Sequence, residues 1–187
     1  MEYKKYKWFY TKNKKLVVAG KSAENNDKLL KEILDTGKEY WVCHTSHPGS
    51  PFSVIIDGSK KDIEEAAMFT GCFSRAWKQG KKKTKVNIFK SSQLQKIKGM
   101  KIGTWGVLGR VEKMEVSLKL VLTKQKNVWK AVPEKSAGKK ILGICPGNVD
   151  KEKRISVLID KIKEKSKMKI DKNQLIAALP AGGFEIY

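Results

Sequence analysis

The segment 74–83 brings together side chains that suit contact with a nucleic acid. Arg75 and Trp77 close an apolar helical pattern, and a run of three lysines follows at once. Cationic groups neutralise phosphates, and an indole ring can stack on a base. A polyanion with flat bases is the partner that uses both kinds of group. Trp77 also fits a core position, because it lies on the apolar face of its own helix, whereas Arg75 lies off that face.

The charge balance of the whole chain favours the same kind of partner. The 187 residues include 40 Lys and Arg against 19 Asp and Glu, which gives a formal net charge of +21. Only Arg75, Arg110 and Arg154 are arginines, so the basic character is that of lysine, which suits backbone phosphates better than base edges. On the charged surface of a thermophile protein the number of glutamates increases together with the number of lysines. In this chain the number of acidic residues has not increased with the number of lysines. The composition therefore favours contact with nucleic acid or with the ribosome.

Gly20, Lys21 and Ser22 precede a helical pattern and match the end of a phosphate-binding P-loop. That motif needs a glycine five positions before Gly20, and Lys15 stands there, so an NTPase is excluded. Two interpretations of the segment remain. Lys21 and the free N–H groups of the helix N-terminus can hold one phosphate, or the helix is simply capped.

Cys43, His44 and His47 place three candidate metal ligands within five residues. A zinc site needs further ligands from a second pair, which the sequence lacks, and Cys43 and His44 point to opposite faces of a strand. Nothing indicates an acid that would orient a catalytic histidine. We therefore expect no catalytic residue, no metal and no cofactor. The alternative is a nucleic-acid-processing or RNA-modifying enzyme that uses these three residues as its active site.

The hydrophobic patterns predict a mixed α/β (α+β) protein with a mostly antiparallel sheet, two main helices and a small C-terminal α/β extension. The character of the sequence pattern changes near Ala137, which predicts two domains, 1–136 and 137–187. Ser22 caps the first helix and Gly37 ends it, and Ser59 with Asp62 forms a capping box. We expect helices over 23–35, 61–78, from Asp150 onward and 172–179, and strands over 8–10, 16–19, 39–44, 52–56, 84–89, 103–109, 114–122, 128–132, 141–145 and 184–186.

Cysteine count and hydropathy predict the cellular setting. The three cysteines are far apart and odd in number, which fits a reducing cytoplasm and no disulfide framework. The N-terminus has no apolar signal region, and no stretch approaches the roughly 20 apolar residues of a membrane span. We expect a cytoplasmic protein with no membrane contact.

Several short motifs resemble the NFACT-R family, the RNA-binding module of the NFACT proteins, over about residues 7–110. They are Trp8-Phe9, Gly20-Lys21-x-Ala23-x-x-Asn26-Asp27, Trp41, Pro48-Gly49-Ser50, Ala66-Ala67, Ser74-Arg75-Ala76-Trp77, Val86-x-Ile88 and Lys98-Gly99-x-Lys101-x-Gly103. The resemblance implies a mixed α/β domain that binds tRNA or large-subunit rRNA, in ribosome-associated quality control of translation, without catalysis. The residues expected to contact RNA are Lys21, His47, Arg75, Trp77, Lys78, Lys81, Lys82, Lys83 and Lys101.

The sequence departs from the family in two respects. Cys43 stands where many relatives have histidine, and Pro51 replaces a residue that is often histidine or serine, so the resemblance gives no support to chemistry at those positions. The N-terminal domain, helix-hairpin-helix and coiled coil of full-length factors are not recognisable, and we expect a protein partner to supply them. A third possibility is a ribosome-associated adaptor whose segment 137–187 docks a protein.

Overall fold

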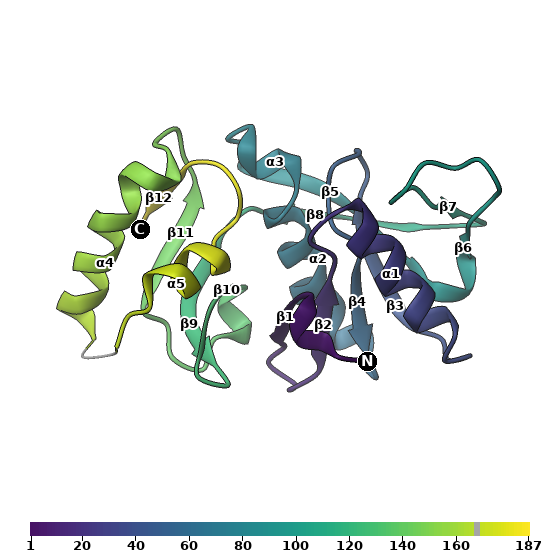
Figure 1. Ribbon diagram of the computed structural model, residues 1–187, viewed down its shortest axis with the longest axis horizontal. Coiled ribbons are helices and arrows are strands. Elements are labelled where there is room, and N and C mark those ends of the chain that lie inside the picture. Colours follow the sequence, from purple (N-terminus) through teal and green to yellow (C-terminus); the bar gives the residue numbers. More distant parts are fainter. Residues whose placement is uncertain (167–168) are drawn as a thin grey trace.

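The computed structural model describes residues 1–166 and 169–187, in which helices and antiparallel sheets form an α+β fold, as the sequence predicts (Figure 1). A six-stranded sheet has the order β1-β2-β4-β3-β5-β8, and a four-stranded sheet has the order β10-β9-β11-β12. The strands of the first sheet are β1 (Lys7–Tyr10), β2 (Leu16–Ala19), β3 (Trp41–Thr45), β4 (Ser53–Ile56), β5 (Lys83–Lys90) and β8 (Glu112–Ser117). Those of the second are β9 (Leu120–Gln125), β10 (Val128–Val132), β11 (Leu142–Pro146) and β12 (Phe184–Ile186). A separate pair is formed by β6 (Leu94–Gln95) and β7 (Gly106–Val107).

The two main helices cover opposite faces of the first sheet. The apolar face of α1 (Ala23–Leu34), with Leu29 and Ile33, shares a core with Val18 and other residues of that face. On the other face, α2 (Ile63–Cys72) packs in a second core that includes Val17. Neighbouring residues of a strand thus enter different cores, which explains why β2 is apolar without interruption.

The single helix expected over 61–78 is divided in two at Ser74. The Ser74 hydroxyl donates to the carbonyl of Gly71 at 2.7 Å and accepts from the backbone N–H of Ala76 at 3.1 Å. It therefore ends the turn after α2 and caps α3 (Arg75–Lys78). This break fixes where the side chain of Arg75 emerges.

The second sheet contains strands from both sides of residue 137. β9 pairs with β10 on one side and with β11 on the other, so the domain boundary expected at 137 falls inside this sheet. The strand expected over 114–122 ends at Ser117, and β9 begins the second sheet three residues later. We call the part from β9 onward the second half and residues 1–118 the first half.

The second half packs against α2 and is completed by α4 (Lys151–Lys165) and α5 (Lys172–Ala178) (Figure 1). One continuous core joins buried residues of α2 with those of β9, α4 and α5. Polar contacts join the halves as well. The indole N–H of Trp77 donates to the carbonyl of Gly183 at 3.0 Å, and Gln125 both donates to and accepts from the backbone of Tyr10. Within the described residues, no helix is long and apolar enough to span a bilayer.

Candidate nucleic-acid interface

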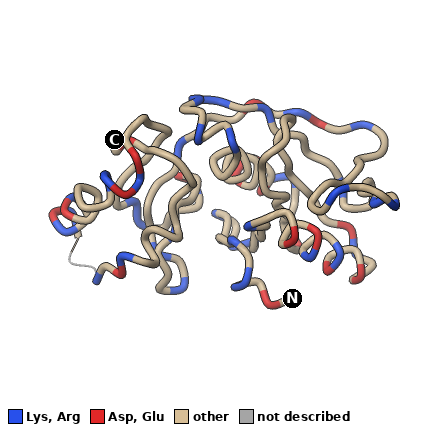
Figure 2. Tube along the Cα trace, turned by 45° about the horizontal axis from the view of Figure 1, so that its top comes forward, with Lys and Arg blue, Asp and Glu red and all other residues tan. Residues whose placement is uncertain are grey.

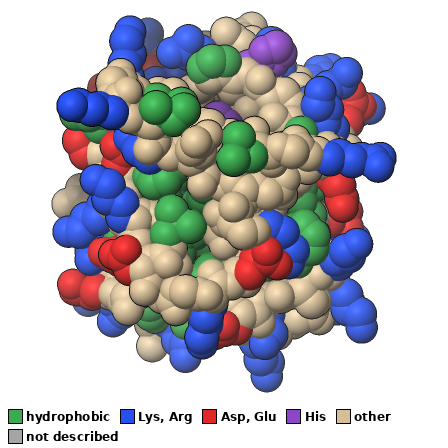
Figure 3. Space-filling model, turned by 90° about the vertical axis from the view of Figure 1, so that its right-hand side faces the viewer, with side chains coloured by type: hydrophobic (Ala, Val, Ile, Leu, Met, Phe, Trp, Pro, Cys, Tyr) green, Lys and Arg blue, Asp and Glu red, His purple; other side chains and the backbone are tan. Residues whose placement is uncertain are grey.

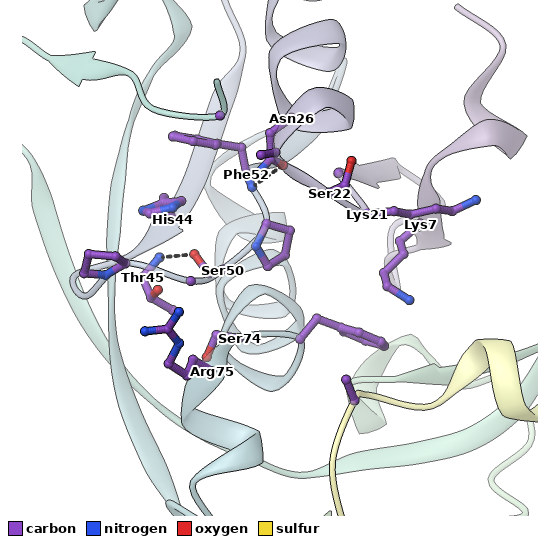
Figure 4. Close-up of a pocket in the computed structure, with 18 of the residues that line it drawn as sticks. Lys7, Lys21, Ser22, Asn26, His44, Thr45, Ser50, Phe52, Ser74 and Arg75 are labelled. Carbon is purple, nitrogen blue, oxygen red and sulfur yellow. Dashed lines mark hydrogen bonds between the residues drawn. The ribbon is translucent and has the colours of Figure 1, made fainter. Parts of the chain in front are cut away.

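A pocket of about 1110 Å³ lies where the N-terminus of α1, the β3–β4 loop and the start of α3 meet (Figure 4). Residues of α5 and the first residue of α4, Lys151, close it from the second half. Lys7 and Lys21 stand on one side of the pocket, and His44 and Arg75 on the other. The site is therefore built from both halves of the molecule.

The start of α1 is held by the side chains that follow Gly20. Ser22 caps the helix through the backbone N–H of Asn25. Asn26 accepts a hydrogen bond from the backbone N–H of Phe52 at 3.1 Å, which ties the helix to the end of the β3–β4 loop. A Cβ at Gly20 would lie 1.9 Å from Oδ1 of Asn26, so only glycine fits there. The exposed Lys21 is consequently presented beside a helix N-terminus, where backbone dipoles favour an anion.

The β3–β4 loop positions Arg75. The backbone N–H of Arg75 donates to the carbonyl of Gly49 at 2.7 Å, and Gly49 has a φ of +99°. A Cβ on Gly49 would lie 3.1 Å from Nε of Arg75, so the guanidinium lies directly over this glycine. Within the loop, Thr45 donates its N–H to the hydroxyl of Ser50 at 3.0 Å and its own hydroxyl to the carbonyl of His47 at 2.6 Å. The hydrogen-bonded loop thus holds the exposed Arg75 at the start of α3 in place.

Cys43, His44 and His47 do not form one site. Cys43 is fully buried in the core on the α2 side, and burial raises the pKa of its thiol to about 12. His44 stacks on Phe52 with ring centroids 4.2 Å apart, and burial lowers its pKa to about 4, so it is neutral at pH 7. His47 is exposed at the pocket rim. Among the described residues, no group of three His, Cys, Asp or Glu side chains could hold a metal ion.

The sequence-predicted contact residues separate into three groups. Lys21, His47, Arg75 and Lys78 line the pocket. Trp77 is a correction, because its ring is 1% exposed and bonded to Gly183, so it belongs to the core and cannot stack on a base. The remaining residues, Lys81, Lys82, Lys83 and Lys101, are exposed but do not line the pocket.

The last group lies on two segments beside the site. Lys83 forms an ion pair with Glu115 at 3.2 Å, on the exposed edge of the first sheet. Lys101 belongs to the loop between β6 and β7, whose next residues, Ile102 to Trp105, line the pocket. The loop is anchored to α1 by Asp27, which accepts hydrogen bonds from the indole N–H of Trp105 at 2.7 Å and from Lys96 at 3.1 Å. Burial alone would raise the pKa of Asp27, but these bonds outweigh it and lower the pKa.

Sequence reasoning missed Lys7, Lys151 and Trp105 as pocket residues. Lys7 begins a strand and Lys151 begins a helix, 144 positions apart, so no local pattern distinguishes them from the other lysines. Trp105 is partly exposed. The sequence feature that could have identified it as a pocket residue is its position between Gly103 and Gly106. Ile97 and Ile102 of the same loop, and Leu108 directly after β7, are more than half exposed. Figure 3 shows hydrophobic side chains on this face, with histidine near its upper edge and basic side chains around them.

Comparison with known proteins agrees with the fold and the resemblance. Residues 5–109 match the sequence model of the NFACT protein RNA binding domain. The archaeal Rqc2 homolog aRqcH of Methanocaldococcus jannaschii is 30% identical over 98% of this chain, which spans 29% of that relative's length. The solved structure of the C-terminal part of the fibronectin/fibrinogen-binding protein from Streptococcus suis superposes with a TM-score of 0.51 at 23% identity. The match covers 59% of this chain and 44% of the Streptococcus suis chain. At 23% identity it supports the fold alone.

Proposed function

The chain belongs to the NFACT RNA-binding-domain family, and on that premise we propose that it binds RNA at the pocket between α1, the β3–β4 loop and α3. The observation that carries the proposal is the charge of the pocket wall. Five Lys and Arg side chains line it, and no Asp or Glu is among the described residues that do so. The basic residues are Lys7, Lys21, Arg75, Lys78 and Lys151. Lys and Arg are spread over both halves of the molecule (Figure 2), but no Asp or Glu of the described residues lines this pocket.

The proposed contacts follow from the chemistry of each wall. Lysines neutralise phosphates and release their counterions, which supplies most of the affinity. Arg75 presents a planar fork that can hold one phosphate through two hydrogen bonds. Trp105 is the partly exposed indole in the pocket and takes the stacking role that the buried Trp77 cannot. The result is recognition of the RNA backbone and of base faces more than of a base sequence.

We propose tRNA or large-subunit rRNA as the RNA, and a cytoplasmic role at the ribosome in quality control of translation. The support is the family, together with a relative that is named as an Rqc2 homolog. Because this chain spans 29% of that relative, we propose RNA contact for this part and not the activity of the whole factor.

The test is crosslinking and sequencing of RNA bound to the protein in cells. The variant Lys21→Glu with Arg75→Glu reverses two charges of the pocket wall. The control, Lys61→Glu with Lys161→Glu, makes the same change in net charge away from the pocket. Lys61 lies before the start of α2, whose other end leads to Arg75, and Lys161 lies ten residues, about 15 Å along α4, beyond Lys151. Recovery of tRNA or large-subunit rRNA that is lost only in the pocket variant supports the proposal. Equal loss in both variants would mean that only net charge matters.

We propose no reaction for this chain. Cys43→Ala and His47→Ala variants should therefore leave any RNA incubated with the protein as intact as the wild type leaves it. RNA cleavage or modification by the wild type that either variant abolishes would restore the enzyme alternative.

A further inference from the structure

A second cavity opens beside the first, between the two halves, and the two share Lys7 and Lys21. Its volume is about 200 Å³, and Lys130 of β10 lies in its wall. Lys151 lines the larger cavity from the start of α4. Lys7 of β1, Lys130 of β10 and Lys151 of α4, together with Lys21 just before α1, thus surround one region. We call these four residues the inter-half lysine cluster. No Asp or Glu of the described residues lines either cavity.

The ammonium groups of the cluster are close enough to affect one another. Burial, and then the charges of Lys151 and Lys21, lower the pKa of Lys7 to about 8. Burial, and then the charges of Lys7 and Lys21, lower the pKa of Lys130 to about 7. The pKa of Lys151 is lowered by burial, against which the neighbouring Asp150 acts. Mutual repulsion of this kind is relieved by a bound anion.

Protein carboxylates supply that anion only in part, through the charge of Asp150 near Lys151. Among the described residues, none of the ion pairs includes a lysine of the cluster. Asp150 already accepts a hydrogen bond from the backbone of Glu152 as the cap of α4. The ammonium of Lys130 rests on the ring of Trp8, 3.5 Å from its centroid, and that of Lys7 on Phe73 at 4.6 Å. An aromatic face attracts a cation without neutralising it.

The wall of the smaller cavity also includes Trp129, which is 1% exposed. Trp129 and Lys130 are consecutive residues of β10, so their side chains leave opposite faces of the strand, and the indole belongs to the core that contains α2. The ammonium groups of the cluster are therefore the donors that suit an oxyanion.

We propose that the inter-half lysine cluster binds a backbone phosphate of the RNA, so that both halves of the chain hold the same RNA molecule. This rests on the proposed function. Lys130 and Lys151 lie outside the residues that match the family, 5–109, so the second half contributes to RNA binding instead of serving only as an attached module.

The first test uses inorganic phosphate and the wild-type protein, with sodium chloride at equal ionic strength as the control. NMR signals of the lysine side chains are followed through a pH titration. Phosphate is expected to raise the pKa of Lys7 and Lys130 more than that of lysines outside the cavities, because an anion favours the charged form. Lys4, which also lines the smaller cavity, and Asp150 are followed with them. Equal shifts for all lysines, or none, would overturn the site.

The second test uses an RNA oligomer with Lys130→Met and Lys90→Met variants. Lys90 is a matched control, because its ammonium also rests on an indole ring, that of Trp41 at 3.9 Å, but lies outside both cavities. Lys130→Met should flatten the slope of log affinity against log salt by roughly 0.7 to 0.9, the value for one lost phosphate contact. Lys90→Met should leave the slope unchanged.

The outcomes separate this proposal from the proposed function. If wild-type RNA binding is strong and the Lys130→Met variant keeps the full slope, the cluster is not a phosphate contact and the pocket proposal stands. If the wild type binds no RNA, the proposed function fails, and the assignment of the phosphate to RNA fails with it. In that case the inorganic-phosphate titration still decides whether the lysines hold an oxyanion.

Discussion

At the scale of single residues, exposure decides which aromatic ring can meet a base. Trp77 and Trp105 both lie next to basic segments, but Trp77 is enclosed by the second half, whereas Trp105 is partly exposed in the pocket wall. Trp105 is held by the hydrogen bond of its indole N–H to Asp27. A ring whose orientation is already fixed loses little entropy on stacking.

Replacing Trp105 should therefore weaken RNA binding. The variant Trp105→Leu removes the stacking surface, and we expect affinity to fall roughly tenfold, since one stacked base contributes about 1–3 kcal/mol. The control Trp105→Phe also loses the bond to Asp27 but keeps an aromatic face, and should keep most of the affinity. Fluorescence anisotropy with a labelled RNA measures both. Equal loss in the two variants would assign the effect to the bond to Asp27.

The same scale explains a cost in stability at Lys130. Its pKa is lowered to about 7 in the folded protein and returns to the ordinary lysine value on unfolding. Between these values the unfolded chain binds more protons, so this residue destabilises the fold fully below about pH 7 and progressively less as the pH rises.

The variant Lys130→Met should consequently raise the free energy of unfolding at pH 7 by about 1 kcal/mol, as expected when a residue serves binding at the expense of stability. Its advantage over the wild type should shrink between pH 7 and pH 9. Thermal unfolding of both proteins across that range provides the measurement. An advantage that grows with pH would contradict the account.

At the scale of elements, the β3–β4 loop and α3 act as one unit through Gly49 and Arg75. Gly49→Ala places a side chain at a left-handed φ and against the arginine. Gly99→Ala is a matched control, because Gly99 has a φ of +92° and no atom within 4 Å of its added Cβ. Both variants should lose about 1–3 kcal/mol of stability from backbone strain, but only Gly49→Ala should also lower RNA affinity. Chemical denaturation with a parallel binding assay distinguishes them, and equal affinities would show that Arg75 is not a contact.

Most elements could be predicted from local signals. Helix starts are marked by the cap Ser22 and by the capping box of Ser59 and Asp62. The turn after α1 is marked by Gly37, which has a positive φ. The failures arose where a local signal competes with tertiary packing. Ser74 interrupts a continuous apolar face, and the alternating strand near 117 changes sheets without any change in its pattern.

Half of the pocket follows from the sequence and half does not. Lys21, His47, Arg75 and Lys78 stand beside glycine turns or caps that mark them. What distinguishes Lys7 and Lys151 of the pocket, and Lys130 of the smaller cavity, is the other lysines that the fold brings close, and no local pattern shows this.

At the scale of the whole molecule, one core and several polar contacts join the halves. Gln125 accepts from the backbone N–H of Tyr10 at 2.7 Å and donates to its carbonyl at 2.8 Å, replacing the strand partner that β1 lacks there. The halves should therefore unfold together in a single transition.

The variant Gln125→Ala leaves both backbone groups of Tyr10 without this partner and should cost about 1–3 kcal/mol. Circular dichroism at helical and at aromatic wavelengths should show coincident unfolding transitions in the wild type. In the variant, both transitions should shift to lower stability by the same amount. Two separate transitions in the wild type would contradict the single core.

The central claim is that RNA lies in the acid-free pocket shared by the two halves. Its most direct test is ultraviolet crosslinking of the wild-type protein to RNA, followed by mass spectrometry to identify the modified residues. We predict adducts on residues of the pocket wall, foremost Lys21, Arg75, Lys78 and Trp105. Adducts confined to the lysine run 81–83, or to the far end of α4, would contradict the claim and make the pocket a structural feature alone.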